Sequence, residues 1–369
     1  MQVAPTPDAS TETVLTEPRA TAMVFMKSGR PHEPGAVPQV RLRQGEVLVR
    51  VELATVCSSD VHTVLGHRVE PAPLVLGHEA VGYIVATGPG GARTTDGADV
   101  SVGDRVVWSV AVHCGVCDRC LRGVHQKCRS LRKYGHERIG HGWELTGSFA
   151  THVHLLEGTP IVRVDGSTPA EVLAPAGCGI ATAWAALAAA ERTVPLAGAT
   201  VLVTGAGLIG LATAAMATER GARVIVSDPS GERRERAGRF GAVETLAPSD
   251  GPIGTEVDVV IEASGAPAAV TAGLDSLAVG GVAVWVGSVF PTEAISVMPE
   301  RVVRGLATIT GAHNYAPRDL VETVAFLRDH WQKYPFADLV GERYALADLD
   351  RALVRAAQQH EVRVGIVPV

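Results

Sequence analysis

The hydrophobic positions follow one pattern up to about residue 170 and another pattern after it. In the first part, short apolar runs end at Gly or Pro, which predicts the strands of an irregular all-β domain. The predicted strands cover residues 22–25, 46–51, 81–85 and 103–108, the last beginning in a turn. Residues 88–101, rich in Gly, Thr and Asp, predict a surface loop, and the Pro- and Thr-rich residues 1–20 predict a disordered tail.

Beyond residue 170, apolar strands alternate with helices, which is typical of βαβ units around a parallel sheet. The Ala-rich segment 170–190 predicts helices around a Gly177-Cys178-Gly179 turn. The predicted strands are 200–204, 223–227, 257–261, 282–286 and 307–310, and the predicted helices are 208–220, 231–240 and 319–330. The run 362–367 predicts a strand that returns to the first domain. The sequence therefore predicts an α/β protein of two domains.

Length and composition narrow the class of protein further. A chain of 369 residues exceeds what one hydrophobic core usually serves. The net charge of -6 gives no electrostatic reason to expect nucleic acid or a membrane surface as a partner. We see no apolar run of membrane-spanning length and no secretory signal. Six cysteines in so long a chain predict reduced thiolates on metal, and hence a cytoplasmic location.

Two cysteines and a histidine form the first candidate metal set. Cys57, His78 and Cys178 offer two thiolates and an imidazole, which leaves one tetrahedral position open, as in a catalytic zinc site. Asp60 could accept the other ring proton of His78 and fix its tautomer, and Glu79 could act beside the metal or approach it transiently. The alternative is that the two cysteines are inert core thiols and that His78 is an ordinary core histidine.

The other four cysteines form a second candidate set. Their spacing is C-x2-C-x2-C-x7-C, and the residues are Cys114, Cys117, Cys120 and Cys128. Four thiolates at this spacing predict a closed, structural zinc site. An iron–sulfur cluster and a reactive disulfide are the alternatives.

A glycine-rich turn predicts a dinucleotide site. It follows a predicted strand, opens a helix and reads Gly205-Ala206-Gly207-Leu208-Ile209-Gly210. The glycines permit a tight turn and close approach of a pyrophosphate, which the amides of the helix N-terminus would hold. Asp228 ends the next strand, where a carboxylate binds the ribose 2′-OH, so we expect NAD rather than NADP. Arg233 and Arg234 weaken that preference, and FAD stays an alternative.

With these motifs in view, the chain resembles the zinc-containing medium-chain alcohol dehydrogenases from about residue 22 to its end. The resemblance rests on Cys57-x-Ser59-Asp60-x-His62, Gly77-His78-Glu79-x-x-Gly82, the four-cysteine lobe, Gly177-Cys178-Gly179 and the glycine-rich turn. It implies a GroES-like catalytic domain in two pieces, 21–170 and 317–369, with a Rossmann domain, 171–316, between them. It also implies homodimers or homotetramers and hydride transfer between a primary or secondary alcohol and NAD.

The same resemblance assigns roles to single residues. Ser59 would pass the alcohol proton, through the cofactor ribose, to His62 at the surface. Thr182 and Asp228 would lie near the cofactor, and Arg363 would match the basic residue that binds the pyrophosphate.

The substrate is less closely specified by the sequence. Residues 311–315 and 319–320 resemble the polyol and threonine dehydrogenase branch, although polyol dehydrogenases typically lack a cysteine at position 178. Residues 64–68 and 311–315 are also similar to a subgroup associated with phosphonate metabolism. The segment 133–143, with Arg68 and His113, could present cations to an anionic substrate such as a hydroxyphosphonate or hydroxy acid. The alternative is an ordinary solvated loop.

Three other classes of protein remain as alternatives. A zinc-free quinone or enoyl reductase would share the two domains but dispense with the metal ligands. A non-catalytic nucleotide-binding protein would keep the fold alone. A zinc-dependent nucleic-acid binder is suggested only by the cysteine lobe, and the acidic net charge opposes it.

Overall fold

The computed structural model describes residues 11–251 and 253–368, which divide into two compact units. Within these residues, the first unit comprises 11–178, 316–328 and 336–368, and the second comprises 179–315, apart from residue 252, and 329–335. We describe each unit separately. A β-rich unit and a parallel-sheet unit together confirm the predicted α/β fold class.

The first unit is built around a seven-stranded sheet in the order β10-β6-β5-β3-β18-β17, with β9 also paired to β3. Its strands are β3 (Val47–Thr55), β5 (Glu79–Thr87), β6 (Arg105–Trp108), β9 (His152–Leu155), β10 (Ile161–Arg163), β17 (Val340–Ala345) and β18 (Arg363–Val367). The predicted return of the chain end is confirmed, because β18 pairs antiparallel to β3. That pairing lies at Gly365 and Thr55, two residues before Cys57.

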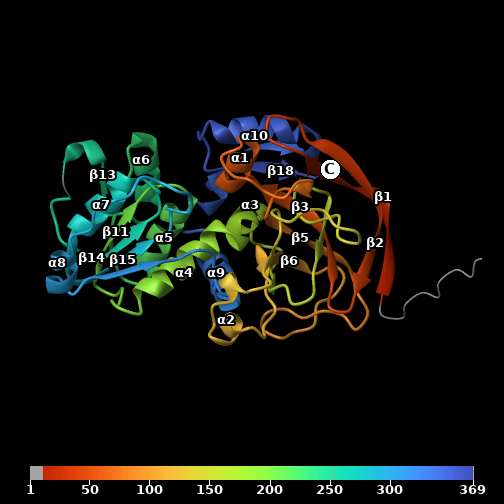
Figure 1. Cartoon of the computed structure of the whole chain (residues 1–369), viewed down its shortest axis with the longest axis horizontal. Coiled ribbons are helices and arrows are strands. Elements are labelled where there is room, and N and C mark those ends of the chain that lie inside the picture. Colours follow the sequence, from red (N-terminus) through yellow and green to blue (C-terminus); the bar gives the residue numbers. More distant parts are fainter. Residues whose placement is uncertain (1–10, 252, 369) are drawn as a thin grey trace, which may run out of the picture. The chain divides into compact units, whose positions relative to one another are not determined.

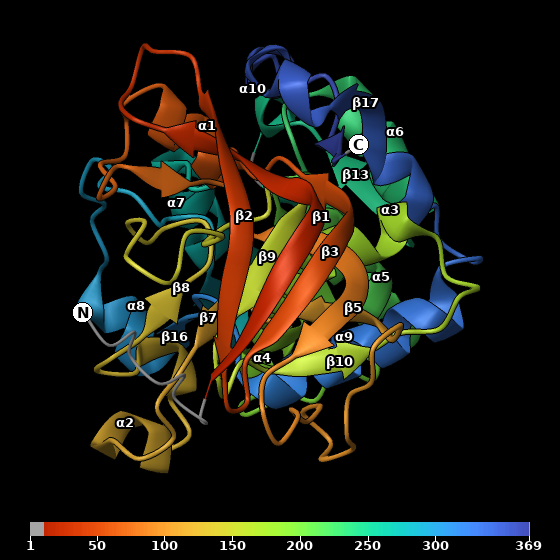
Figure 2. The ribbon, with the colours of Figure 1, turned by 90° about the vertical axis from the view of Figure 1, so that its right-hand side faces the viewer.

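A long hairpin forms a second sheet in this unit, in the order β2-β1-β4 (Figure 2). The strands are β1 (Thr11–Phe25), β2 (Glu33–Arg43) and β4 (Leu74–Val75), and a two-stranded sheet joins β7 (Ala111–Val112) to β8 (Arg132–Lys133). The prediction of a tail over residues 1–20 is wrong for residues 11–20, which lie in β1 and pair with β2. Residues 1–10 of that predicted tail lie outside the described residues.

Short helices connect the strands of the first unit. They are α1 (Ser58–Val64), α2 (Asp118–Leu121), α3 (Ala170–Leu173) and α10 (Leu349–Ala357), with 3₁₀ helices η1 (His125–Lys127), η2 (Ala174–Gly177), η4 (Phe336–Leu339) and η5 (Leu346–Asp348). The core beneath them is mainly aliphatic, and the aromatic residues Phe149 and Tyr134 are its largest fully buried side chains. The catalytic candidates Cys57 and Cys178 stand at the start of α1 and the end of η2.

The second unit is a six-stranded parallel sheet in the order β13-β12-β11-β14-β15-β16. Its strands are β11 (Thr200–Thr204), β12 (Arg223–Ser227), β13 (Glu244–Leu246), β14 (Val257–Glu262), β15 (Leu277–Trp285) and β16 (Thr308–Gly311). Figure 1 shows β11, β14 and β15 side by side. These central strands are runs of Val, Ile and Leu buried on both faces, as expected where helices cover a parallel sheet.

The helices of the second unit follow the predicted alternation. They are α4 (Gly179–Ala190), α5 (Leu208–Glu219), α6 (Gly231–Arg239), α7 (Pro267–Asp275) and α8 (Pro299–Arg304), with the 3₁₀ helix η3 (Pro248–Asp250). In the part of the chain that the structure describes, no single helix is long and apolar enough to cross a membrane. The segments Ala170–Gly177 and Gly179–Ala190 meet the length and composition criteria only as a bent pair.

The boundaries between the units differ from those predicted at 170/171 and 316/317. The first boundary lies after Cys178, and residues 329–335, at and beyond the end of α9 (Pro317–His330), belong to the second unit. The aromatic ring of Tyr334 stacks on Phe240, with ring centroids 6.3 Å apart. The hydroxyl of Tyr334 donates to Glu219 at 2.5 Å. Contacts with residues a hundred positions away therefore decide where this segment packs, and local sequence does not show them.

Candidate functional site

Asp60 holds together two segments of the metal site. It lies in the first turn of α1 with no exposed surface, and its carboxylate accepts hydrogen bonds from the amides of Cys57 at 2.9 Å and Gly77 at 3.2 Å. The Cys57 bond is that of an acidic residue closing the N-terminus of a helix. Gly77 has φ +86, and a Cβ there would lie 2.7 Å from the ring of Phe149. Only glycine therefore fits beside Asp60.

Four predicted ligand residues converge in the first unit. One ligand atom from each of Cys57, His78, Glu79 and Cys178 lies within 4.8 Å of the other three. The Nδ1 atom of His78 faces the Asp60 carboxylate at 3.6 Å, which is beyond hydrogen-bond length. Its Nε2 atom lies 3.4 Å from the hydroxyl of Ser59. The predicted Asp60–His78 interaction is therefore electrostatic at this distance.

The electrostatics of this group suit a divalent cation. A hydrogen bond from Cys178 lowers the pKa of Cys57 well below its usual value, and that same bond, with burial, raises the pKa of Cys178. Burial opposes a charge on His78, but the Asp60 carboxylate and the Cys57 thiolate raise its pKa to about 10. The sulfurs of Cys57 and Cys178 thus share one proton, because two buried thiolates this close would repel each other. Zinc takes deprotonated thiolate and neutral imidazole, so its charge would replace these protons.

Glu79 and Arg363 form a buried ion pair beside the metal ligands. Arg363 donates to the carboxylate of Glu79 through Nε at 2.7 Å and through a terminal nitrogen at 2.9 Å, and Thr55 donates to it at 2.7 Å. Arg363 also donates to the carbonyl oxygen of Val362 at 2.9 Å and makes a long contact of 3.9 Å with the sulfur of Cys57. Sequence reasoning noticed both residues but not their pairing, which joins positions 284 apart. The pyrophosphate-binding role of Arg363 stays a prediction.

A second polar group, made of His136, Glu70 and Arg68, packs against the candidate metal ligands. The sequence analysis named Arg68 and the segment 133–143, which contains His136, but it did not predict these contacts. The ring of His136 lies 4.8 Å from the ring of His78, centroid to centroid. Glu70 accepts from His136 at 3.0 Å and pairs with Arg68 at 2.6 Å. A Cβ on Gly135 would lie 2.6 Å from the carbonyl oxygen of Gly77, so this turn sits directly on the segment that carries His78.

The predicted relay residues lie along α1. Ser59 and His62 are one helical turn apart, which places them on the same face. Both are half-buried, and Ser59 lies beside His78. Burial is the largest cause of the lowered pKa of His62, followed by the charge of His67.

The four-cysteine lobe has the geometry of a closed zinc site. The sulfur–sulfur distances are 3.5 Å from Cys117 to Cys120, 3.9 Å from Cys117 to Cys128 and 3.5 Å from Cys128 to Cys114. Tetrahedral zinc with bonds of about 2.3 Å separates its sulfurs by about 3.8 Å. Backbone amides of Arg129 and Cys120 lower the pKa of Cys117 to about 6, which favours the thiolate. All six cysteines are free of disulfides.

The glycine-rich turn of the second unit has room for a phosphate. Gly205 has φ +97, and a Cβ on Gly210 would lie 1.8 Å from the carbonyl oxygen of Gly205. A Cβ on Gly207, by contrast, would meet nothing within 4 Å. Gly207 caps α5, so the amides that begin this helix, at Leu208 and Ile209, border open space. This arrangement fits a bound pyrophosphate.

Asp228 supports that turn from the end of β12. Its buried carboxylate accepts from the amides of Ala206 and Ser230, each at 2.8 Å. Arg234 donates to the carbonyl oxygen of Asp228 at 2.7 Å. Arg233 lies in the first turn of α6, and Thr182 lies buried in the first turn of α4. Sequence reasoning did not show that Asp228 braces the glycine-rich turn itself.

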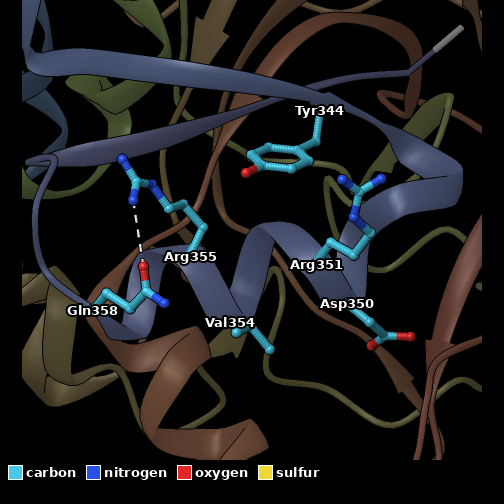
Figure 3. A pocket seen from close by; sticks show the side chains of 6 residues that line it. All are labelled: Tyr344, Asp350, Arg351, Val354, Arg355 and Gln358. Atoms are coloured by element: carbon cyan, nitrogen blue, oxygen red, sulfur yellow. Dashed lines mark hydrogen bonds between the residues drawn. The ribbon is translucent and has the colours of Figure 1, made fainter.

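A separate hollow of about 420 Å³ lies between α10 and β17 (Figure 3). Its lining residues are Tyr344, Asp350, Arg351, Val354, Arg355 and Gln358. The charged groups are already paired: Arg355 binds Glu361, Arg351 binds Asp348 and Asp350 binds His32. We assign no ligand to this hollow.

A β-rich unit with a Cys-His-Cys set, in the same chain as a parallel-sheet unit with a glycine-rich turn, defines the class of zinc-dependent dehydrogenases. The family model of the alcohol dehydrogenase GroES-like domain matches residues 43–165, and that of the zinc-binding dehydrogenases matches residues 209–329. The chain belongs to the zinc-containing alcohol dehydrogenase family of medium-chain dehydrogenases/reductases. Its members bind zinc and NAD(P), and the protein is an oxidoreductase.

Relatives span nearly the whole chain. An L-threonine 3-dehydrogenase of Streptomyces coelicolor is 32% identical over 88% of this chain and 94% of its own length. A 5-exo-hydroxycamphor dehydrogenase of Pseudomonas putida is 30% identical over 90% of this chain and 94% of its own length. The crystal structure of an alcohol dehydrogenase from Thermotoga maritima matches with a TM-score of 0.89 and 29% identity, covering 95% of this chain and all of that one (100%).

These relatives decide between some of the sequence-based alternatives. They support an enzyme over a non-catalytic nucleotide-binding protein or a nucleic-acid binder. They give no support to the phosphonate subgroup or to a hydroxyphosphonate substrate. The oligomeric state and the cytoplasmic location stay predictions.

Replacing Asp60 by Asn should weaken zinc binding at the Cys57 site alone. The amide cannot accept from both Cys57 and Gly77 and carries no charge toward His78, so we expect about a 10- to 100-fold loss of affinity. Zinc content after dialysis against a chelator should fall to about one ion per chain, held by the four-cysteine lobe. The exposed Asp99, changed to Asn, is the control. Equal zinc retention by both variants would contradict the role given to Asp60.

Proposed function

We propose that the protein oxidises an alcohol by transferring its hydride to NAD at a zinc site held by Cys57, His78 and Cys178. The observation that carries this proposal is the convergence of these ligand atoms, with Glu79, within 4.8 Å of one another. Zinc, when bound, would supply Lewis-acid polarisation of the substrate oxygen, and the nicotinamide would accept the hydride.

The residues of the chain carry out the remaining steps. Asp60 fixes the position of Cys57, and Arg363 balances the charge of Glu79, which keeps the ligand set in place. Ser59, beside His78, receives the proton that leaves the alcohol. His62, one turn further along α1, takes the proton toward solvent, as general base.

The variant Cys57→Ala should lose alcohol oxidation by at least about a thousandfold, because Lewis-acid catalysis contributes several kcal/mol of transition-state stabilisation. Nicotinamide absorbance across a panel of alcohols measures this loss. The exposed neighbour Ser58, changed to Ala, should keep the wild-type rate. A Cys57→Ala enzyme with undiminished turnover would refute the zinc-dependent mechanism.

The cofactor preference rests on Asp228. A carboxylate at the end of β12 favours a ribose 2′-OH and repels a 2′-phosphate. The guanidinium of the neighbouring Arg234 donates to the carbonyl oxygens of Asp228 and Pro229, at 2.7 and 3.0 Å. These two acceptors compete with the 2′-phosphate of NADP for the guanidinium. This supports NAD as the cofactor.

In Asp228→Asn, kcat/KM for NAD should fall about tenfold or more, since a hydrogen bond to a charged group is worth about 1.5–3 kcal/mol. The value for NADP should fall less or rise, because the repelling charge is gone. Steady-state kinetics with both cofactors measure the ratio. Asp250→Asn, at an exposed position of the same unit, controls for surface charge. An unchanged NAD/NADP ratio would remove Asp228 as the selecting residue.

The substrate we propose is an alcohol that carries a carboxylate, such as a hydroxy acid or a hydroxy amino acid. Lys133 ends β8, directly before the turn at Gly135 that packs on Gly77. Burial is the largest cause of its lowered pKa, with Arg68 and Lys127 next, while Cys178 acts in the opposite direction. An ammonium within electrostatic range of a metal ligand can bind the anionic end of a substrate. Relatives named L-threonine 3-dehydrogenase act on such a compound.

Lys133→Gln should raise KM about tenfold for a carboxylate-bearing alcohol and leave KM for a neutral alcohol of equal size unchanged. The matched control is Arg138→Gln, which removes an exposed cation from the same loop. Steady-state rates on the paired substrates measure the difference. Equal effects of the two substitutions, or equal KM values for charged and neutral alcohols in the wild type, would exclude the anionic substrate.

A further inference from the structure

A second histidine lies against His62 in the turn that follows α1. The Nδ1 atoms of His62 and His67 are 3.4 Å apart, and their ring centroids are 5.6 Å apart. The backbone fixes this approach, because the amides of His67 and Arg68 both donate to the carbonyl oxygen of His62, at 2.9 and 3.1 Å. At this separation the N–H of one ring can donate to the bare nitrogen of the other.

Exposure increases along this series of side chains. His78 is buried, Ser59 and His62 are half-buried, and His67 is exposed. A group that receives a proton from a half-buried base and itself faces water is suited to release that proton to solvent.

We propose that His67 is the outer member of the proton relay and accepts from His62 the proton that leaves the alcohol. His62 takes the proton on Nε2 and gives up the proton on Nδ1 to the Nδ1 of His67. His67 then releases its own Nε2 proton to water, so each ring ends neutral and no electrons move. This inference rests on the proposed function, including the Ser59–His62 steps. His67 acts through His62 and does not touch the substrate.

The charges around His62 are consistent with this direction of transfer. Burial is the largest cause that lowers the pKa of His62; His67 and Arg68 lower it further, and Cys57 raises it. Because its pKa is lowered, His62 stays neutral, and so able to accept a proton, at more acidic pH. The charge of Arg68 is itself balanced by Glu70. On α10, which packs against α1, the charged residues are those already paired at the hollow: Asp350, Arg351 and Arg355.

The test is the pH dependence of hydride transfer in His67→Ala, measured by nicotinamide absorbance in single turnovers so that product release does not mask it. We expect a loss of about three- to tenfold near pH 6 that disappears near pH 9, where hydroxide replaces the outer acceptor. Loss of the His67 charge raises the pKa of His62, so the acid limb of the profile should also move to higher pH. Imidazole in the buffer should restore the rate.

The controls separate this inference from the proposed function. His360→Ala removes another exposed histidine of the first unit and should leave the profile unchanged. The double variant His62→Ala/His67→Ala should be no slower than His62→Ala alone, since the two rings act in series. If His62→Ala is impaired at low pH and His67→Ala has the wild-type profile, the relay ends at His62 and the inference is wrong. A wild-type protein that oxidises no alcohol would overturn the proposed function together with it.

Discussion

The constraint on which the site depends is the concentration of negative charge in a buried volume. Two cysteine sulfurs and the Glu79 carboxylate come within 4.8 Å of one another, and these groups cannot all be ionised in a buried volume without compensation. Arg363 compensates Glu79 directly, with two hydrogen bonds below 3 Å, and leaves the two thiolates to a divalent cation. The charge balance thus calls for a divalent cation, and the thiolate and imidazole ligands favour zinc as that cation. It also explains why Arg363, a residue of the last strand, lies at the metal centre.

The same region shows how a buried reaction can stay connected to water. Helix α1 starts at the candidate metal ligand Cys57, and the half-buried Ser59 and His62 of this helix lead from the buried His78 to the exposed His67 in the turn that follows. Asp60 faces inward and fixes the ligands, whereas Ser59 and His62 lie on another face of the helix. One short helix would therefore separate the positioning of the ligands from the proposed proton transfer, because helical spacing places residues three apart on one face and adjacent residues on different faces.

Local patterns in the sequence predicted most of the fold and the composition of the site. Alternating apolar runs located the central strands, the C-x2-C spacing located the cysteine lobe, and the glycines located the turn before α5. The failures have a common physical cause. Residues 11–20 look like a tail because each strand of a hairpin gains its order from the other. The pairing of Glu79 with Arg363, the packing of His136 on His78 and the assignment of Tyr334 to the second unit all depend on distant partners, which no local pattern encodes.

The two candidate zinc sites therefore depend on folding in different ways: one is local in the chain, and the other joins distant segments. The lobe of Cys114, Cys117, Cys120 and Cys128 is local, so a metal ion can organise it before the rest of the chain is in place. The site of Cys57, His78 and Cys178 forms only after distant segments have met, and its counter-charge arrives with β18, the last strand. Because closing such loops costs entropy that only the assembled site repays, metal binding there stabilises the closed first unit as a whole. A metal at the first site would thus be held by the completed fold, whereas a metal in the cysteine lobe would help to complete it.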